Sequence, residues 1–261
     1  GACRIGLVDS YTYIGDPAFY DLPVEEMISD EFAAERAALI DMDNMQAMES
    51  VPLSDLPVTK LEPTAEESQH TTHIAVIDQY GNIVSTTNTL GNGWGCKFMA
   101  PGLGFFYNSH IGNLDHENPD SPDYVMPGKR VRSTISPSLV LQDGNPIMAV
   151  GSPGSLAIPP AVATIINNVL LYGMNVQQAI NEPRAMAINR SGMDSPARVS
   201  IEQPRFDPDL VAQMEGIGYE MKDVGEYNMA VGGIAAIYLD RDNGIFYAGA
   251  DPRRGYKALA Y

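Results

Sequence analysis

The chain alternates between short apolar runs that suit β-strands and longer stretches with helical periodicity. Residues 72–78 are mostly β-branched and apolar, a Gly81-Asn82 turn follows, and residues 83–87 form a second run of the same kind. Two such runs around a glycine turn predict a β-hairpin. Similar turn residues, 143–145 and 240–244, separate the later runs. By this pattern we expect strands at residues 71–78, 82–90, 137–142, 146–150, 233–239 and 245–249.

Helical periodicity precedes these strands and lies between them. One helix is marked by Ser29, which suits the N-cap position, and by acidic residues in the first turn. Hairpins grouped at both ends of the second part of the chain, with helices between them, predict an antiparallel α+β domain built in layers. The helices are expected at residues 2–14, 29–41, 159–172, 175–182 and 208–217.

Residues 42–70 interrupt this pattern. They are acidic, contain three prolines and show no sustained helical or strand period. Such a segment is typical of a tail or an exposed connector. Because the first strand begins directly after it, the sequence predicts a boundary between His70 and Thr71, which separates residues 1–70 from residues 71–261.

Composition narrows the function classes. The net charge of −17 argues against a nucleic-acid partner, because a phosphate backbone is bound by a basic surface. Cys3 and Cys96 have no metal-ligand spacing, and whether they pair is left open. His70 and His73 lie at the start of a strand rather than on one helix face, so neither a metal nor another cofactor is expected. The longest apolar stretch, 157–172, is broken by prolines and asparagines, so no membrane-spanning helix is predicted.

Two features point to amide chemistry. The turn 151–155, Gly-Ser-Pro-Gly-Ser, leads from a strand into a helix and can offer backbone N–H groups to a developing oxyanion. By itself this turn also suits a plain helix start. Thr71 adds a nucleophile, because a threonine at the start of a chain can use its own α-amino group as the base. That amine has an ordinary pKa of about 8, so a useful fraction is neutral at physiological pH.

The motifs from Thr71 onward resemble the small subunit of the γ-glutamyltransferase family. The opening TTHIAVIDQYGN resembles that subunit's start, which runs T-T-H-x-x-V-x-D-x-x-G-N. PGLGFFYNS, PGKRVRSTISPSLVLQDG, GSPGS and FYAGADPRRG follow in the same order. Residues 15–40 resemble the closing helices of the family's large subunit. The resemblance therefore covers nearly the whole chain but not the earlier part of the large subunit.

The resemblance implies an N-terminal-nucleophile hydrolase, whose αββα sandwich holds two antiparallel sheets between helical layers and is only partly present here. It also implies a proenzyme that cuts itself before Thr71 and then cleaves γ-glutamyl amides, passing the acyl group to water or to an amine. The expected partners are the remainder of the large subunit and a small acyl-amide substrate. A homodimer is left open. The family favours a periplasmic or secreted location, and the cytoplasm is left open.

The resemblance also assigns residues by position. Thr71 is the nucleophile, and Thr89 supports it by hydrogen bonding. The oxyanion N–H groups are expected from Gly154 and Ser155, and substrate contacts from Ser133, Thr134, Arg132, His110 and Asn113.

The chain departs from the family where glutamate is recognised. Gly91 replaces the family's asparagine, and Asn113 replaces an aspartate that pairs with the substrate α-ammonium. An amide keeps a hydrogen-bond acceptor but loses the charge, and Asp115 is an alternative partner for the ammonium. The sequence therefore keeps open an acylase or amidohydrolase with another acyl donor, such as a cephalosporin side chain or a small dicarboxylic monoamide. A non-catalytic relative, in which Thr71 stays internal, is a further alternative.

Overall fold

The computed structural model describes residues 1–44, 70–187 and 198–261. Most of the expected connector 42–70 lies outside the described residues. All six predicted strands are present, and five helices lie where helical periodicity was expected. The strands are β1 (Thr72–Ile77), β2 (Ile83–Asn88), β3 (Ser138–Gln142), β4 (Asn145–Gly151), β8 (Ala235–Asp240) and β9 (Ile245–Ala250). The helices are α1 (Ala2–Tyr13), α3 (Asp30–Ala38), α4 (Ile158–Leu170), α5 (Val176–Asn181) and α6 (Pro208–Gly216), and a short α2 (Val24–Met27) precedes α3.

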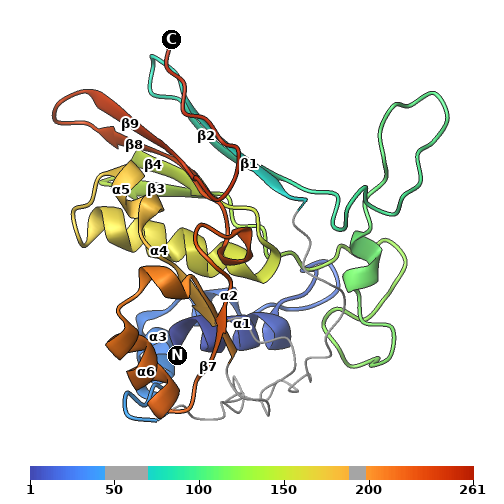
Figure 1. Cartoon of the computed structure of the whole chain (residues 1–261). Coiled ribbons are helices and arrows are strands. Elements are labelled where there is room, and N and C mark those ends of the chain that lie inside the picture. Colours follow the sequence, from blue (N-terminus) through green and yellow to red (C-terminus); the bar gives the residue numbers. More distant parts are fainter. Residues whose placement is uncertain (45–69, 188–197) are drawn as a thin grey trace.

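A four-stranded antiparallel sheet in the order β3-β4-β8-β9 forms the centre of the molecule. Helices α4 and α5 cover one face of this sheet (Figure 1). The main core lies between these helices and the sheet, where Met148 and Val150 of β4 pack with Ile158 and Ile165 of α4. Alternate residues of a strand point to opposite faces, so Ala149 and Gly151 point away from the helices.

The β1–β2 hairpin packs on that second face of the sheet. Its inward side carries His73, which is buried, and Ser85, whose hydroxyl donates to the Val150 carbonyl at 3.1 Å. Its outward side is apolar and exposed in the described part of the chain, with Ile74, Val76 and Val84 each about half accessible. The helix, sheet and sheet layers of the expected sandwich are therefore present, while the outer hairpin face has no helical cover among these residues.

A third sheet was not predicted. It consists of β5 (Ala185–Ala187), β6 (Arg198–Ile201) and β7 (Glu220–Asp223), and β6 pairs with β7 in parallel across the helix α6. These strands have only three or four residues each, which is too short to show a strand period, and β7, Glu-Met-Lys-Asp, is also mostly polar. Val199 and Ile201 of this sheet pack on Val211 of α6 in a small separate core.

The N-terminal helices are joined to the rest of the chain by ion pairs. Within this unit, Arg36 of α3 pairs with the buried Asp9 of α1 at 2.9 Å. Arg130, from the later part of the chain, pairs with the buried Asp16 at 2.7 Å. Cys3 and Cys96 are both free and exposed. No helix among the described residues is long and apolar enough to cross a membrane.

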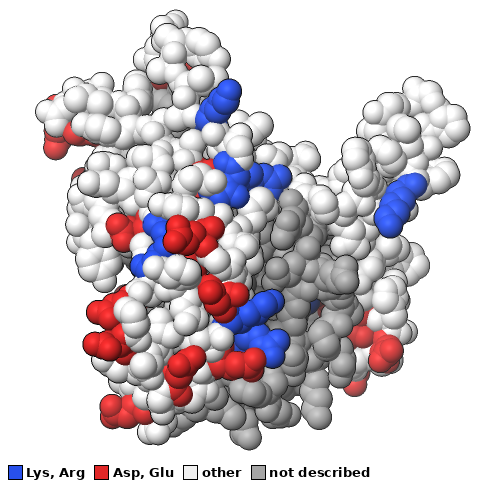
Figure 2. All heavy atoms as spheres, viewed as in Figure 1, with Lys and Arg blue, Asp and Glu red and all other residues white. Residues whose placement is uncertain are grey.

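On the face shown in Figure 2, carboxylates gather over the lower part of the molecule, while the upper projections carry few charged atoms.

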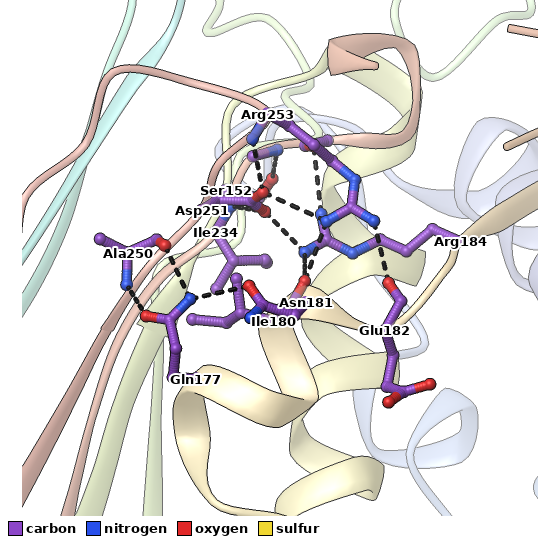
Figure 3. Close-up of polar contacts among 12 residues, drawn as sticks. Ser152, Gln177, Ile180, Asn181, Glu182, Arg184, Ile234, Ala250, Asp251 and Arg253 are labelled. Carbon is purple, nitrogen blue, oxygen red and sulfur yellow. Dashed lines mark hydrogen bonds and ion pairs between the residues drawn. The ribbon is translucent and has the colours of Figure 1, made fainter. Parts of the chain in front are cut away.

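A cluster of buried charges ties the end of β9 to the neighbouring elements (Figure 3). Asp251 accepts from the Arg184 guanidinium at 2.6 Å and from the Ile234 N–H at 2.8 Å. Arg253 pairs with Glu202 at 2.5 Å and with Asp251 at 3.2 Å. Burial lowers the pKa of Arg184 to about 10, so its guanidinium is charged at neutral pH. The cluster therefore joins α5, β6, β8 and β9 through charge-assisted bonds without access to water.

We expect Asp251→Asn to destabilise the fold strongly. The change leaves Arg184 as a buried cation without its carboxylate partner, a kind of loss that typically costs about 3–5 kcal/mol. The matched control is Glu220→Gln, which breaks the exposed pair with Arg198 and should cost less than about 1 kcal/mol. Urea unfolding of both variants measures the difference. Equal losses would contradict a structural role for the buried cluster.

Candidate active site

Thr71 lies at the mouth of the β1–β2 hairpin, directly opposite Thr89. The register pairs Thr72 with Asn88, so the next pair outward along the ladder is Thr71 with Thr89. The Thr71 hydroxyl donates to the Thr89 hydroxyl oxygen at 3.0 Å, and the Gly91 N–H donates to the same oxygen, also at 3.0 Å. Thr71 is only 4% exposed. Hairpin pairing thus brings together the two threonines that the sequence assigned to one site.

His73 packs the β1–β2 hairpin against the end of β4. Its ring lies over Gly151 so closely that a Cβ on that glycine would come within 2.3 Å of ring atoms. Its Nδ1 lies 2.8 Å from the Thr87 hydroxyl, and its backbone N–H donates to the Tyr256 hydroxyl at 3.0 Å. Because His73 is two residues after Thr71, this contact places the start of β1 against the start of the turn 151–155.

The turn 151–155 leads from β4 through a short 3-10 helix, Ser155–Ala157, into α4, as the sequence predicted. Gly154 has a φ of 127° and Ser155 a φ of 53°, a region that an L-residue such as serine rarely occupies. The turn is held from behind, because the buried Ser152 hydroxyl accepts from the Gly233 N–H at 3.0 Å. Gly154 also packs so tightly that a Cβ there would lie 3.1 Å from the Gly232 Cα.

Ser133 and Thr134 lie beside this turn. The Thr134 hydroxyl donates to the Ser155 carbonyl at 3.1 Å, while the Ser133 hydroxyl accepts from the Ile135 N–H at 3.2 Å. The expected carboxylate-binding pair and the expected oxyanion turn are therefore in direct contact. Ser133 is exposed.

His110 and Asn113 belong to a 3-10 helix, His110–Asn113, that packs beside Gly91. A Cβ on Gly91 would come within 2.5 Å of the Ser109 hydroxyl and 2.9 Å of the His110 ring. The Ser109 and His110 side chains thus occupy the space that an asparagine at position 91 would need. His110 Nε2 is buried without a hydrogen-bond partner, and burial lowers the pKa of this imidazole. Asn113 is exposed.

An open cleft of about 520 Å³ begins at His110. Its walls are mainly apolar, with Ile111, Leu114 and Met126 among them, and Lys129 lies at one side. Asp115, the alternative ammonium partner, uses its Oδ1 atom to accept the backbone N–H groups of residues 117 and 118 at 2.9 and 3.0 Å. That carboxylate therefore holds its own loop, which leaves Asn113 as the outward-facing candidate.

Arg132 contacts the N-terminal helical unit. Its Nη1 pairs with Asp123 at 2.9 Å and donates to the Tyr11 carbonyl at 3.1 Å, and the guanidinium lies 3.8 Å from the Tyr11 ring centroid. These contacts favour a structural role over the expected contact with substrate.

The loop 91–108 projects from the body next to the site (Figure 1). Trp94, Phe98 and Phe105 on this loop are each more than half exposed, and Lys97 is its one charged residue.

The packing role of His73 and the contact from Tyr256 had no signal in the sequence, because both depend on residues far apart in the chain. Among the described residues, no group of three or more His, Cys, Asp or Glu side chains could hold a metal ion.

Comparison with known proteins points to one family. A family model described as gamma-glutamyltranspeptidase matches residues 1–261. The glutathione hydrolase proenzyme of Bacillus subtilis (strain 168) is 28% identical over 266 residues, which cover 98% of this chain and 43% of that protein. The acylase ACY 1 proenzyme of Pseudomonas sp. (strain SE83) is 34% identical over 183 residues, which cover 70% of this chain and 31% of that protein.

A solved structure agrees with these relatives. The cephalosporin acylase from Bacillus halodurans superposes with a TM-score of 0.83 at 25% identity, covering 99% of this chain and 43% of that chain. The chain thus spans less than half the length of the relatives it matches.

We expect His73 to make the fold less stable in acid. Burial lowers the pKa of His73 from 6.5 to about 4, so the unfolded chain takes up a proton first as the pH falls. The contribution of His73 to the free energy of unfolding should be constant above pH 6.5. It should fall between pH 6.5 and 4, by at most about 1.4 kcal/mol per pH unit for one proton. Urea unfolding from pH 7 to 4.5 should therefore show a shallower pH slope in His73→Gln than in wild type. His116→Gln, at an exposed histidine, should keep the wild-type slope. The interpretation fails if both variants keep it.

Proposed function

Because the chain belongs to the gamma-glutamyltranspeptidase family, we propose that the complete protein cleaves γ-glutamyl or related acyl amides through an acyl-enzyme on Thr71. The observation that carries this proposal is the hydrogen bond between the Thr71 and Thr89 hydroxyls at the hairpin mouth. The chain spans 43% of the Bacillus subtilis relative, so the activity is assigned to the complete protein. The names of the relatives, glutathione hydrolase proenzyme and acylase proenzyme, support an amide hydrolase.

Maturation is the first proposed use of the Thr71 hydroxyl. Its oxygen attacks the His70 carbonyl, and the bond to the Thr71 nitrogen breaks, which leaves an ester on the hydroxyl. Water then hydrolyses that ester, which frees a carboxylate on His70, the hydroxyl and a new α-amino group on Thr71. The word proenzyme in the relatives' names supports such a cut.

Turnover repeats the same chemistry on a substrate. The neutral α-amine takes the hydroxyl proton as the oxygen attacks the amide carbonyl. The oxyanion that forms is assigned to the N–H groups of Gly154 and Ser155, which the short β4-to-α4 connection brings to one turn. The proton then passes to the leaving amine, and the acyl group on Thr71 is transferred to water or to a second amine.

The donor is expected to carry a carboxylate. Ser133 and Thr134 are the candidates to bind it, since Thr134 is bonded to Ser155 of the oxyanion turn. The γ-glutamyl group is the first candidate, because of the family. A non-glutamyl donor is the second, because Asn113 offers no negative charge to an α-ammonium and because one relative is an acylase.

The remainder of the large subunit is the expected partner. The apolar outer side of the β1–β2 hairpin and the aromatic side chains of the loop 91–108 are exposed here. Exposed apolar surface of this kind usually marks an interface, so we assign both surfaces to contact with that remainder. A homodimer stays open.

Thr71→Ala should block maturation. Wild-type full-length protein should split between His70 and Thr71, giving a fragment whose N-terminal sequence is Thr-Thr-His, whereas the variant should stay intact. Intact mass and N-terminal sequencing measure this directly. A wild-type protein that hydrolyses substrate while remaining uncut would rule out the mechanism.

Asn113→Asp should improve glutamyl specificity. Restoring a carboxylate for the α-ammonium adds a charge-assisted bond that we expect to contribute roughly 1.5–3 kcal/mol, or about one to two decades in binding. The value of kcat/KM for γ-glutamyl-p-nitroanilide should rise, while glutaryl-p-nitroanilide, which has no α-amine, should not improve. If wild type is already efficient with the glutamyl compound and the variant gains nothing, the ammonium is bound elsewhere.

A further inference from the structure

The N-terminal end of β1 carries the proposed nucleophile. Thr71 lies just outside the strand, and its hydroxyl donates to the Thr89 hydroxyl at 3.0 Å. In the proposed mature enzyme, Thr71 is a chain end without the peptide bond to His70. Chain ends fray unless other contacts hold them, while catalysis loses as much as about 100-fold when a reacting group moves by 1 Å. The cut therefore increases the need for a second anchor close to Thr71.

The C-terminal segment offers that anchor. Beyond β9 the chain passes back beside the β1–β2 hairpin (Figure 1), and the Tyr256 hydroxyl accepts the backbone N–H of His73 at 3.0 Å. The donor is on a residue whose ring is fixed over Gly151. His73 is thus held by two contacts: its ring packs on Gly151 of β4, and its backbone N–H donates to Tyr256.

The segment that carries Tyr256 is itself held in place by the buried charge cluster. Asp251 and Arg253, which begin it, are 1% and 5% exposed and belong to the buried charge cluster. A tight turn follows, in which the Arg254 N–H donates to the Asp251 carbonyl at 3.1 Å and the Tyr256 N–H to the Arg254 carbonyl at 2.8 Å. Only two residues, 254 and 255, therefore separate the buried ion pairs of Arg253 from Tyr256, whose hydroxyl meets β1.

We propose that Tyr256 is a positioning residue for the nucleophile: through the N–H of His73 it fixes the start of β1, and with it Thr71, against the turn 151–155. Tyr256 takes no part in bond making or proton transfer. The inference rests on the proposed function, since it gives the tyrosine a purpose only if Thr71 reacts.

The direct test is Tyr256→Phe in the full-length protein, with Tyr247→Phe as the matched control. Tyr247 is an exposed tyrosine on the neighbouring strand β9, so its loss of a hydroxyl should leave the site intact. We expect Tyr256→Phe to slow self-cleavage and to lower kcat for γ-glutamyl-p-nitroanilide about 5- to 30-fold, with KM changed less than about twofold. The midpoint of thermal unfolding should match that of the control, because the ring and its packing remain.

A second test moves the other side of the anchor. Gly151→Ala places a methyl group where the His73 ring lies, so it should displace the start of β1 and lower kcat by more than about tenfold. His73→Ala in the same protein removes the obstructing ring. If position is what matters, the double variant should recover at least about threefold over Gly151→Ala alone.

The outcomes separate the two proposals. If wild type self-cleaves and Thr71→Ala does not, the proposed function stands whatever Tyr256→Phe does. In that case, a kcat and a self-cleavage rate equal to those of Tyr247→Phe would overturn the positioning role. A fall in the unfolding midpoint of Tyr256→Phe, with kcat unchanged in the folded fraction, would also overturn it. A wild-type protein that neither self-cleaves nor hydrolyses the probe removes both proposals.

Discussion

The site depends on β4 being buried on both faces. One face packs on α4 and forms the main core, and the other receives the β1–β2 hairpin. A strand enclosed in this way has limited space for a side chain at each position. At Gly151 there is no space for a side chain, because the His73 ring occupies its place. The strand that carries Thr71 and the turn 151–155 meet at this contact, so the geometry of the candidate site is a consequence of sheet-on-sheet packing.

The buried charge cluster is the second constraint on this region. Taking arginine and carboxylate groups out of water is costly, and apolar replacements of the same volume are often equally stable. Here the charged groups accept and donate bonds to the backbone of four elements that no single apolar side chain could reach. Asp251 holds the N–H of Ile234, and Glu202 accepts from the N–H of Asn228 at 3.0 Å. The cluster therefore defines the path of the chain behind the turn 151–155, where Gly232 and Gly233 support it.

Much of the fold followed from local sequence, because hairpins and helices are marked by nearest neighbours. Turn residues located β1 with β2 and β8 with β9, and Ser29 located the start of α3. The strands β5, β6 and β7 were not predicted, since a run of three or four residues is too short to show a strand period. The pairing of Thr71 with Thr89 followed from the family resemblance and agrees with the hairpin register. The seat of His73 on Gly151 and the bond from Tyr256 could not be predicted, because each joins segments separated by dozens of residues or more.

The contact between Gly91 and the pair Ser109 and His110 also limits how this site can change over generations. A side chain at position 91 requires the Ser109 hydroxyl and the His110 ring to move, and the φ of 84° there penalises any side chain further. An asparagine at position 91 therefore requires the side chains of residues 109 and 110 to change or to rotate away. We expect substitutions at these three positions to depend on one another, so that a variant combining them can be viable when the single change at 91 is not.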